Sequence, residues 1–152
     1  MKRFIHSMAV FCLICMFANC TKKADSSLKL NVQLVSPVWQ KDMTGKYPFT
    51  MTAVVSLSDS LQSALALGEF DQVGAFVNGE CRGTGVLVAS GAKYLYYLMI
   101  QGSAAENSRV TFKYFNGISH TMFTTTPLLP FSVDASFGSP DKPVILPLAR
   151  VK

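Results

Sequence analysis

The sequence has few of the residues that build metal centres and disulfide frameworks. It contains two histidines and four cysteines in 152 residues. Cys12 and Cys15 lie in an N-terminal apolar segment that we expect to be removed, and Cys20 follows it. Cys81 would then be the only unmodified thiol, so an internal disulfide is excluded. One thiol and His120 also fall short of the three or four ligands of a transition-metal site, and we expect no cofactor.

Charged residues are sparse and do not cluster by sign. Without Lys2 and Arg3 the chain has 12 basic and 9 acidic residues, a net charge of about +3. The lysines are scattered, and the one basic pair, Lys22 and Lys23, lies beside the expected cleavage site. A nucleic-acid partner needs a basic stripe, so this class of partner is excluded.

A long apolar run is also missing, because the apolar segment Met8–Ala18 is too short to span a bilayer. It follows a basic start and is typical of an export signal. The segment leads into Phe17-Ala18-Asn19-Cys20, which resembles a lipobox, where signal peptidase cuts before the cysteine and leaves it acylated. Asn19 departs from the usual Gly, Ala or Ser, so conventional cleavage after a small residue stays open as an alternative.

These features divide the chain into three parts. Residues 1–19 are expected to be a lipoprotein signal peptide, and residues 20–27 a lipidated polar tether. Residues 28–150 are long enough for one folded domain. We expect a lipid on Cys20 to anchor the protein in an outer membrane, with the domain on the periplasmic face or at the cell surface.

Period-2 alternation of apolar residues predicts two strands early in the domain, at residues 28–34 and 49–57. Between Ser58 and Leu67 the apolar period changes to four. Ser58 or Asp59 can cap a helix, and Gly68 suits a left-handed stop. We therefore expect one short helix or helical turn between strands.

The central feature is a hairpin in residues 71–85, DQVGAFVNGECRGTG. Asn78-Gly79 predicts a type I′ turn, which needs positive φ at both positions. The turn would place Ala75 opposite Arg82. Interior glycines near position 83 predict a bulge or a local twist.

Further strands are expected in the second half of the domain. Residues 93–100 are apolar or aromatic on both faces, which is typical of a central strand or of one that keeps an aromatic face for a partner. Residues 109–124 form a second hairpin with Asn116-Gly117 at its turn. A brief strand is expected at residues 131–135, and a closing edge strand at 143–148.

Seven or eight short strands with one helical turn predict an all-β fold, an antiparallel β-sandwich of immunoglobulin-like architecture. The pattern D-x-V-G-A-F-V-x-G-E-C-R-G also resembles a β-sandwich module that recurs in secreted and surface lipoproteins of Bacteroidales-type bacteria. Its matching positions are Asp71, Val73–Val77 and Gly79–Gly83, and the resemblance extends over residues 47–148. It implies a sandwich fold at the surface, but no activity and no catalytic residues.

Cys81 and His120 are the only pair that could act as nucleophile and base. Cys81 lies on the Phe76 face of its hairpin, where a cysteine behaves as a small hydrophobe. His120 lies on the polar face of the second hairpin, opposite Lys113. We therefore expect Cys81 in the core and no catalytic dyad.

Glu69, Asp71 and Glu80 could gather near one end of the central hairpin. Paired carboxylates suit glycoside hydrolysis, and oxygen ligands suit calcium. However, no loop has closely spaced Asp and Asn ligands, and Asp71 is expected to cap a turn or to pair with Arg82. We expect no metal here, and we assign structural roles to Asp71, Asn78, Gly79, Cys81 and Arg82.

Aromatic side chains are the best material for a binding surface. A flat aromatic face can stack on sugar rings, and tyrosine adds a hydroxyl. The alternative is that these side chains fill the core and cover the sheet, as β propensity favours. The candidate ligand-binding residues are Tyr94, Tyr96, Tyr97, Trp39 and Tyr47.

We therefore expect a non-enzymatic lipoprotein whose domain is a binding or adhesion module, with a glycan or a surface protein as its partner. The alternative is a structural or accessory subunit of a surface assembly or of a polysaccharide-uptake system. An exposed aromatic groove would favour sugar binding. A long unpaired apolar edge strand would favour assembly by strand addition.

Overall fold

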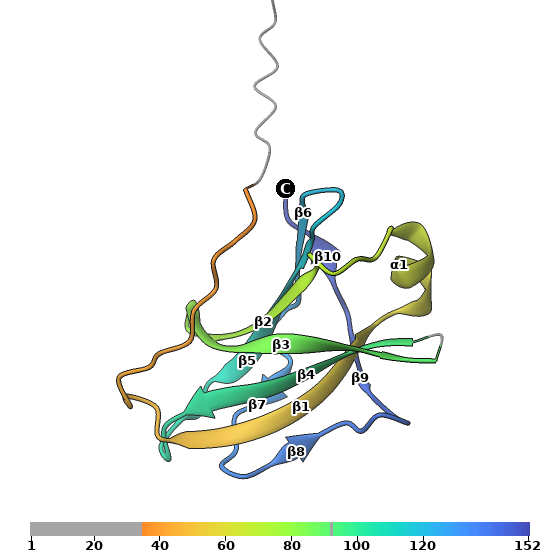
Figure 1. Cartoon of the computed structure of the whole chain (residues 1–152). Coiled ribbons are helices and arrows are strands. Elements are labelled where there is room, and N and C mark those ends of the chain that lie inside the picture. Colours follow the sequence, from red (N-terminus) through yellow and green to blue (C-terminus); the bar gives the residue numbers. More distant parts are fainter. Residues whose placement is uncertain (1–34, 92) are drawn as a thin grey trace, which may run out of the picture. The chain divides into compact units, whose positions relative to one another are not determined.

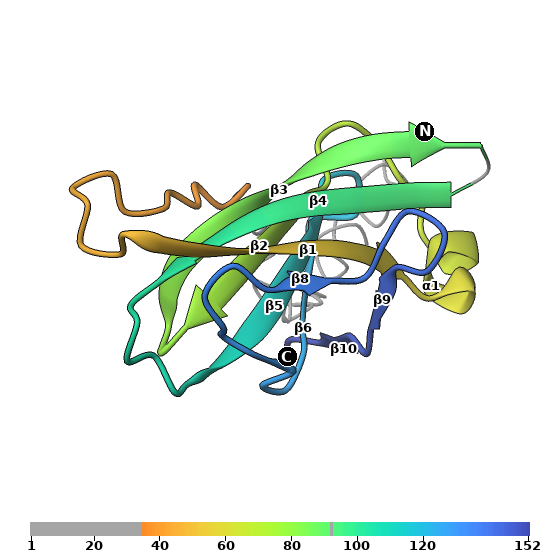
Figure 2. The same cartoon turned by 90° about the horizontal axis from the view of Figure 1, so that it is seen from below.

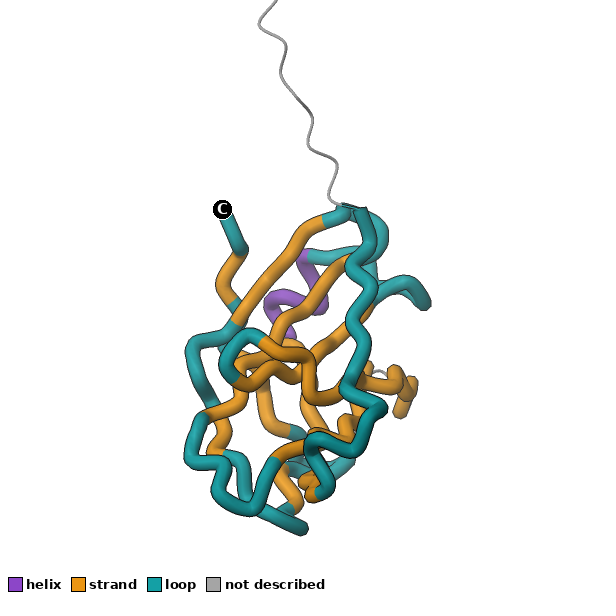
Figure 3. Tube along the Cα trace, turned by 90° about the vertical axis from the view of Figure 1, so that its left-hand side faces the viewer, coloured by secondary structure: helices purple, strands orange, loops and turns teal. Residues whose placement is uncertain are grey.

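A computed structural model describes residues 35–91 and 93–152, so Cys20, the expected signal and tether, and the expected strand at 28–34 lie outside the described residues. The described part is built of strands with one short helix (Figures 1 and 3). The helix is α1 (Asp59–Ala64). The strands are β1 (Phe49–Leu57), β2 (Gln72–Val77), β3 (Glu80–Ser90), β4 (Lys93–Gly102), β5 (Arg109–Asn116), β6 (Thr121–Thr124), β7 (Leu129–Pro130), β8 (Ser136–Phe137), β9 (Val144–Leu146) and β10 (Ala149–Arg150).

One mixed sheet joins these strands in the order β10-β6-β5-β2-β3-β4-β1-β8, with β7 paired to β5 and β9 paired to β1. The long strand β3 belongs to both halves, since its first residues pair with β2 and residues 85–90 pair with β4. Figure 2 shows β3, β4 and β1 side by side, with β2 and β5 crossing behind them. The all-β class is confirmed, and the narrower immunoglobulin-like sandwich stays a prediction.

The core lies between the two halves of the curled sheet. Alternate residues of β1 point into it, as the period-2 pattern predicted, although Phe49 at the start of the strand is exposed. The opposite wall comes from β2 and β5, and β4 contributes its own alternate residues. The largest fully buried side chains of this core are those of Tyr96, Tyr114, Phe112, Met51, Leu57, Ile100 and Leu146.

Gly83 lies close to the point where the pairing of β3 passes from β2 to β4. A Cβ added at Gly83 would lie 2.3 Å from the carbonyl oxygen of Met99 on β4. Backbones approach this closely only where one of them carries no side chain. The register of β2 and β3 shifts at the same place, between Ala75 and Phe76, which confirms the predicted bulge.

The one short helix expected between the strands is confirmed as α1. Ser58 caps it, because its hydroxyl accepts a hydrogen bond from the backbone N–H of Leu61 at 3.3 Å. The helix ends at Ala64, and Leu65 already has extended backbone. The expected left-handed stop at Gly68 is wrong, since Gly68 has no positive φ. In the described part of the chain, no helix is long and apolar enough to cross a membrane.

Two expectations for the C-terminal half need correction. Residues 131–135 form no strand, because Asp134 takes a left-handed φ of 57° that breaks the extended backbone. The closing strand at 143–148 is present but shorter, as β9, and it runs parallel to β1 at the margin of the sheet. The C-terminal residues then form β10, which pairs with β6 and was not predicted.

Candidate functional site

The central hairpin has the predicted turn but not the predicted register throughout. Asn78 and Gly79 have φ values of 50° and 83°, as a type I′ turn requires. The first two pairs from the turn follow the prediction, with Phe76 opposite Cys81. Beyond them Ala75 pairs with Gly83, so the predicted pair with Arg82 is wrong. Arg82 is the extra residue of the bulge.

The bulge places the Arg82 side chain inside the protein, with 4% of it exposed. Its guanidinium lies 3.3 Å from Glu80 and 3.4 Å from Glu106. The Tyr47 ring covers it, with the guanidinium carbon 3.2 Å from the ring centre. A buried guanidinium between two carboxylates is already compensated in charge. Arg82 therefore ties three distant segments together.

Tyr47 and Trp39 are engaged in packing. The Tyr47 hydroxyl donates a hydrogen bond to Glu80, and its ring rests on Arg82. Trp39 meets Phe76 edge to face at 5.5 Å between ring centres. A Cβ added at Gly74 would lie 2.8 Å from the Trp39 ring, so the glycine makes room for it. Both aromatic residues fasten the segment before β1 to the hairpin.

Asp71 caps a turn, which was one of the two expected alternatives. It does not pair with Arg82, which was the other. Its carboxylate accepts hydrogen bonds from the Tyr114 hydroxyl at 2.8 Å and from the Asn116 side chain at 3.1 Å. It also accepts from the backbone N–H groups of Gly117 and Gly68. A buried carboxylate with four donors is a structural centre, because burial without partners would cost several kcal/mol.

The three carboxylates considered for hydrolysis or calcium do not gather. Asp71 and Glu80 lie at opposite ends of β2, a separation of roughly 20 Å along the strand. Glu80 is engaged by Lys46 at 2.9 Å, and hydrogen bonds from Tyr47 and Lys46 lower its pKa below the ordinary value. Glu69 is exposed. Over residues 35–91 and 93–152, no group of three metal-ligating side chains is found.

Cys81 and His120 are also far apart. Cys81 pairs with Phe76, whose partner on β5 is Thr111, whereas His120 lies in the loop beyond Asn116. Five residues of strand separate these points, about 17 Å. Cys81 is half-buried rather than fully in the core, and burial raises the pKa of its thiol. His120 packs its ring against Phe115.

The tyrosines of β4 do not form one platform. Tyr96 is 1% exposed and belongs to the core, so the expectation that it lines a binding face is wrong. Tyr94 lies beside the end of α1 and the residues that follow it, and it shares the parity of Tyr96. Tyr97 points to the opposite, outer face. Alternation along the strand separates these rings, which is why a run of tyrosines in sequence made no flat surface.

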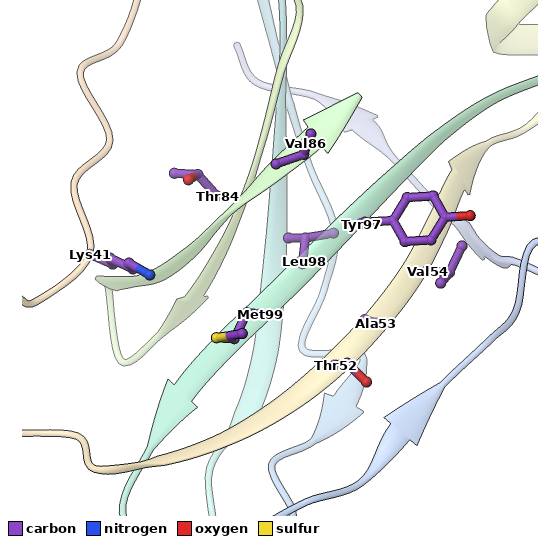
Figure 4. A pocket seen from close by; sticks show the side chains of 9 residues that line it. All are labelled: Lys41, Thr52, Ala53, Val54, Thr84, Val86, Tyr97, Leu98 and Met99. Carbon is purple, nitrogen blue, oxygen red and sulfur yellow. The ribbon is translucent and has the colours of Figure 1, made fainter. Parts of the chain in front are cut away.

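Tyr97 instead lines a groove on the outer face of β3, β4 and β1. The groove has a volume of about 580 Å³. Figure 4 shows the Tyr97 ring reaching from β4 toward Val54 of β1, its partner in register, with Val86 and Met99 on either side. The lining residues are Lys41, Thr52, Ala53, Val54, Thr84, Val86, Tyr97, Leu98 and Met99.

The groove is apolar and open. Val86 is 66% exposed, Met99 54% and Tyr97 36%. Exposed apolar side chains that are contiguous on a monomer mark interaction sites, unlike scattered ones. Val54, Val86 and Met99 were not predicted, because the candidate binding residues were aromatic ones. The signal was available, since β3 and β4 carry apolar residues at both parities and only one face can point into the core.

Comparison with protein-family models, with curated proteins and with solved structures finds no match for this chain. The assignment of a function therefore depends on the residues and on the geometry described above.

Proposed function

We propose that the chain is a non-enzymatic, lipid-anchored binding module that takes a protein partner on the outer face of β3, β4 and β1. The observation that carries this proposal is the open apolar groove of Val54, Val86, Tyr97 and Met99. Burying such side chains stabilises an interface by about 25 cal/mol per Å² of apolar surface removed from water.

The composition of the groove favours a protein over a glycan. Stacking on sugar rings relies on aromatic faces, and Tyr97 is the one aromatic residue that lines the groove among the described residues. The remaining lining is aliphatic or small, apart from Lys41 and the two threonines, Thr52 and Thr84. Aliphatic side chains complement the apolar residues of another polypeptide.

The residues considered for catalysis support a binding role. Asp71 is held by hydrogen bonds and Glu80 by an ion pair, and Cys81 lies about 17 Å along the sheet from His120. None of these side chains lines the groove. A partner bound there would meet a surface for docking without a nucleophile or a general base.

Membrane attachment through Cys20 fits this role. A lipid anchor confines the module to a surface, where many copies act together and weak single contacts add up. Replacing Cys20 with Ala should abolish labelling by radioactive palmitate and release the protein from the membrane fraction. Undiminished labelling of Cys20→Ala would overturn the lipid anchor, while the groove proposal would still stand.

The groove is tested by photo-crosslinking on intact cells that produce the full chain. A benzoylphenylalanine placed at Tyr97 or at Met99 should give the same discrete protein adduct. The matched control is the same photo-reactive residue at Ile118, which is also exposed but lies in the loop between β5 and β6. Absence of adducts at positions 97 and 99, or identical adducts at position 118, would refute the proposal.

A glycan array tests the alternative that the partner is a sugar. If the full chain binds a glycan and Tyr97→Ala abolishes that binding without loss of folding, the partner is a sugar and the protein assignment is wrong.

A further inference from the structure

The second half of β3 has an open edge. Residues 85–90 pair with β4 on one side, from Gly85 opposite Leu98 to Ser90 opposite Lys93. On the other side β2 pairs only as far as Thr84, and within residues 35–91 and 93–152 no strand continues beyond it. Figure 2 shows β3 at the margin of this part of the sheet. In an antiparallel ladder every second residue directs its N–H and C=O away from its partner, so these groups face the open side.

This edge lacks the features that normally protect an edge strand. Its sequence, GVLVAS, contains no charged residue and no proline, and Val86 and Val88 are exposed. Edge strands are usually short, charged, bulged or covered, because an open apolar edge pairs with other chains. The opposite margins of the sheet follow that rule, since β8, β9 and β10 have two or three residues each and Pro143 and Pro147 flank β9.

We infer that a partner chain adds an extended strand to β3 along Gly85–Ser90, an inference that rests on the proposed function and names its mode of binding. The open edge and the groove share Val86, so a donated strand would extend the sheet while the rest of the partner covers the groove. Backbone hydrogen bonds supply the affinity in this mode, and alternate side chains supply the specificity.

The charges nearby define the donor. Lys41 is the one charged side chain lining the groove within the described residues, and Lys93 lies opposite Ser90 at the tip of the hairpin. The matching donor is apolar at alternate positions and acidic at its ends. A second copy of this chain fits less well, because its own edge is uncharged and brings another Lys93. A symmetric ladder of six residues also falls short of the ~1,000 Å² that a stable interface needs.

The test uses a capped peptide, EVTVTVE, titrated calorimetrically into the full chain in detergent micelles. The first control is the same peptide N-methylated at its five central residues, which keeps the side chains but removes the N–H donors. Strand addition requires that the methylated peptide binds at least ten-fold more weakly. Equal affinity of the two peptides would overturn strand addition and leave side-chain docking in the groove.

Two matched variants locate the peptide. Val88→Glu places a negative charge on the open edge, and Ile118→Glu places the same charge in the loop between β5 and β6, outside both the edge and the groove; both positions are exposed. We expect at least ten-fold weaker binding for Val88→Glu and less than a three-fold change for Ile118→Glu, with unchanged thermal unfolding of both. The reverse order would overturn the edge assignment.

The acidic character of the donor is tested separately. The neutral peptide TVTVTVT should bind three- to ten-fold more weakly than EVTVTVE at low salt, and the difference should vanish at high salt because exposed charges are screened. Equal binding at low salt would refute the acidic donor. If neither peptide binds while crosslinking at Tyr97 and Met99 persists, strand addition fails and the proposed function survives; if crosslinking fails as well, both fail.

Discussion

The chain contains two Asn-Gly pairs, and they adopt different backbone conformations. Asn78-Gly79 forms a two-residue turn in which both residues have positive φ. Both are exposed, and a Cβ added at Gly79 would have nothing within 4 Å. The turn is held by its own backbone preference, because only Gly, Asn and Asp take this conformation at low cost.

At the second pair, Asn116 and Gly117, neither residue has a positive φ. Asn116 is fully buried at the end of β5 and pairs with Thr121, so residues 117–120 form the loop and His120 takes the left-handed position. The Asn116 amide donates to Asp71 and to the Ala66 carbonyl, and its oxygen accepts from the Ser119 N–H at 2.8 Å. The predicted two-residue turn is therefore wrong here.

The difference shows when a local signal decides the structure. The dipeptide sets the turn where its side chain is exposed and makes one hydrogen bond, from the Asn78 amide to the Ser108 hydroxyl at 3.1 Å. At the second pair, the asparagine is buried, because the Asn116 amide donates a hydrogen bond to the buried carboxylate of Asp71, 45 residues away. The predicted faces of the second hairpin still hold, with Tyr114 opposite Phe123 and both buried, because the register moved by an even number of residues.

The largest difference in the free energy of unfolding is expected between the alanine variants of the two asparagines. Asn116→Ala removes a buried group and leaves partners of Asp71 and Ser119 unsatisfied, so the free energy of unfolding should fall by about 3 kcal/mol. Asn78→Ala should cost about 1 kcal/mol, from the strain of an alanine at positive φ and the loss of one exposed hydrogen bond to Ser108. Urea unfolding of both variants checks this. Equal losses would contradict the distinction between the two turns.

The glycines give a smaller, sharper contrast. In Gly117→Ala the new Cβ would lie 2.5 Å from Cβ and 2.7 Å from the backbone oxygen of Phe70, and such overpacking costs about 2 kcal/mol. In Gly79→Ala the space is open, so only the positive φ costs, about 1 kcal/mol. Thermal unfolding compares them. Gly79→Asn is the control, because asparagine tolerates this φ and should be nearly neutral; a large loss there would refute the conformational explanation.

Local pattern predicted the parts of the fold that depend on neighbours in sequence. The strand at 49–57, the Asn78-Gly79 turn and the bulge near Gly83 all follow from alternation and turn chemistry. The burial of Arg82 does not, because it needs Tyr47 and Glu106, which are distant in the sequence. For β4 the sequence left two alternatives, a central strand or one that keeps an aromatic face for a partner. The strand is central, between β3 and β1, and which of its side chains are exposed depends on how the sheet curls.

Cys81, which follows the first turn closely, should tolerate change better than Asn116. Its side chain is half-buried, and its thiol donates a weak hydrogen bond to the Gly83 carbonyl at 3.7 Å. Cys81→Ser should therefore cost about 1 kcal/mol, from placing a hydroxyl in a partly apolar site. Because burial raises the pKa of the thiol, the native protein should react with a thiol reagent at pH 8 more slowly than glutathione does. Faster modification would overturn this assignment.

The smallest effect concerns the charge next to the first turn. Hydrogen bonds from Tyr47 and from Lys46 hold the pKa of Glu80 below its ordinary value of 4.5. A carboxyl whose pKa is lower in the folded state stabilises the protein above its unfolded pKa, and this contribution disappears as the pH falls through the folded value. Stability of the wild type relative to Glu80→Gln should therefore be greatest at neutral pH and should shrink below pH 4.5. Because Glu80 is exposed, salt should weaken the difference as well. Denaturant unfolding at pH 7 and pH 3 measures it, with Glu69→Gln as the control, an exposed carboxyl on the other side of β2. A difference between wild type and Glu80→Gln that grows toward low pH would contradict the contacts of Glu80 with Tyr47 and Lys46.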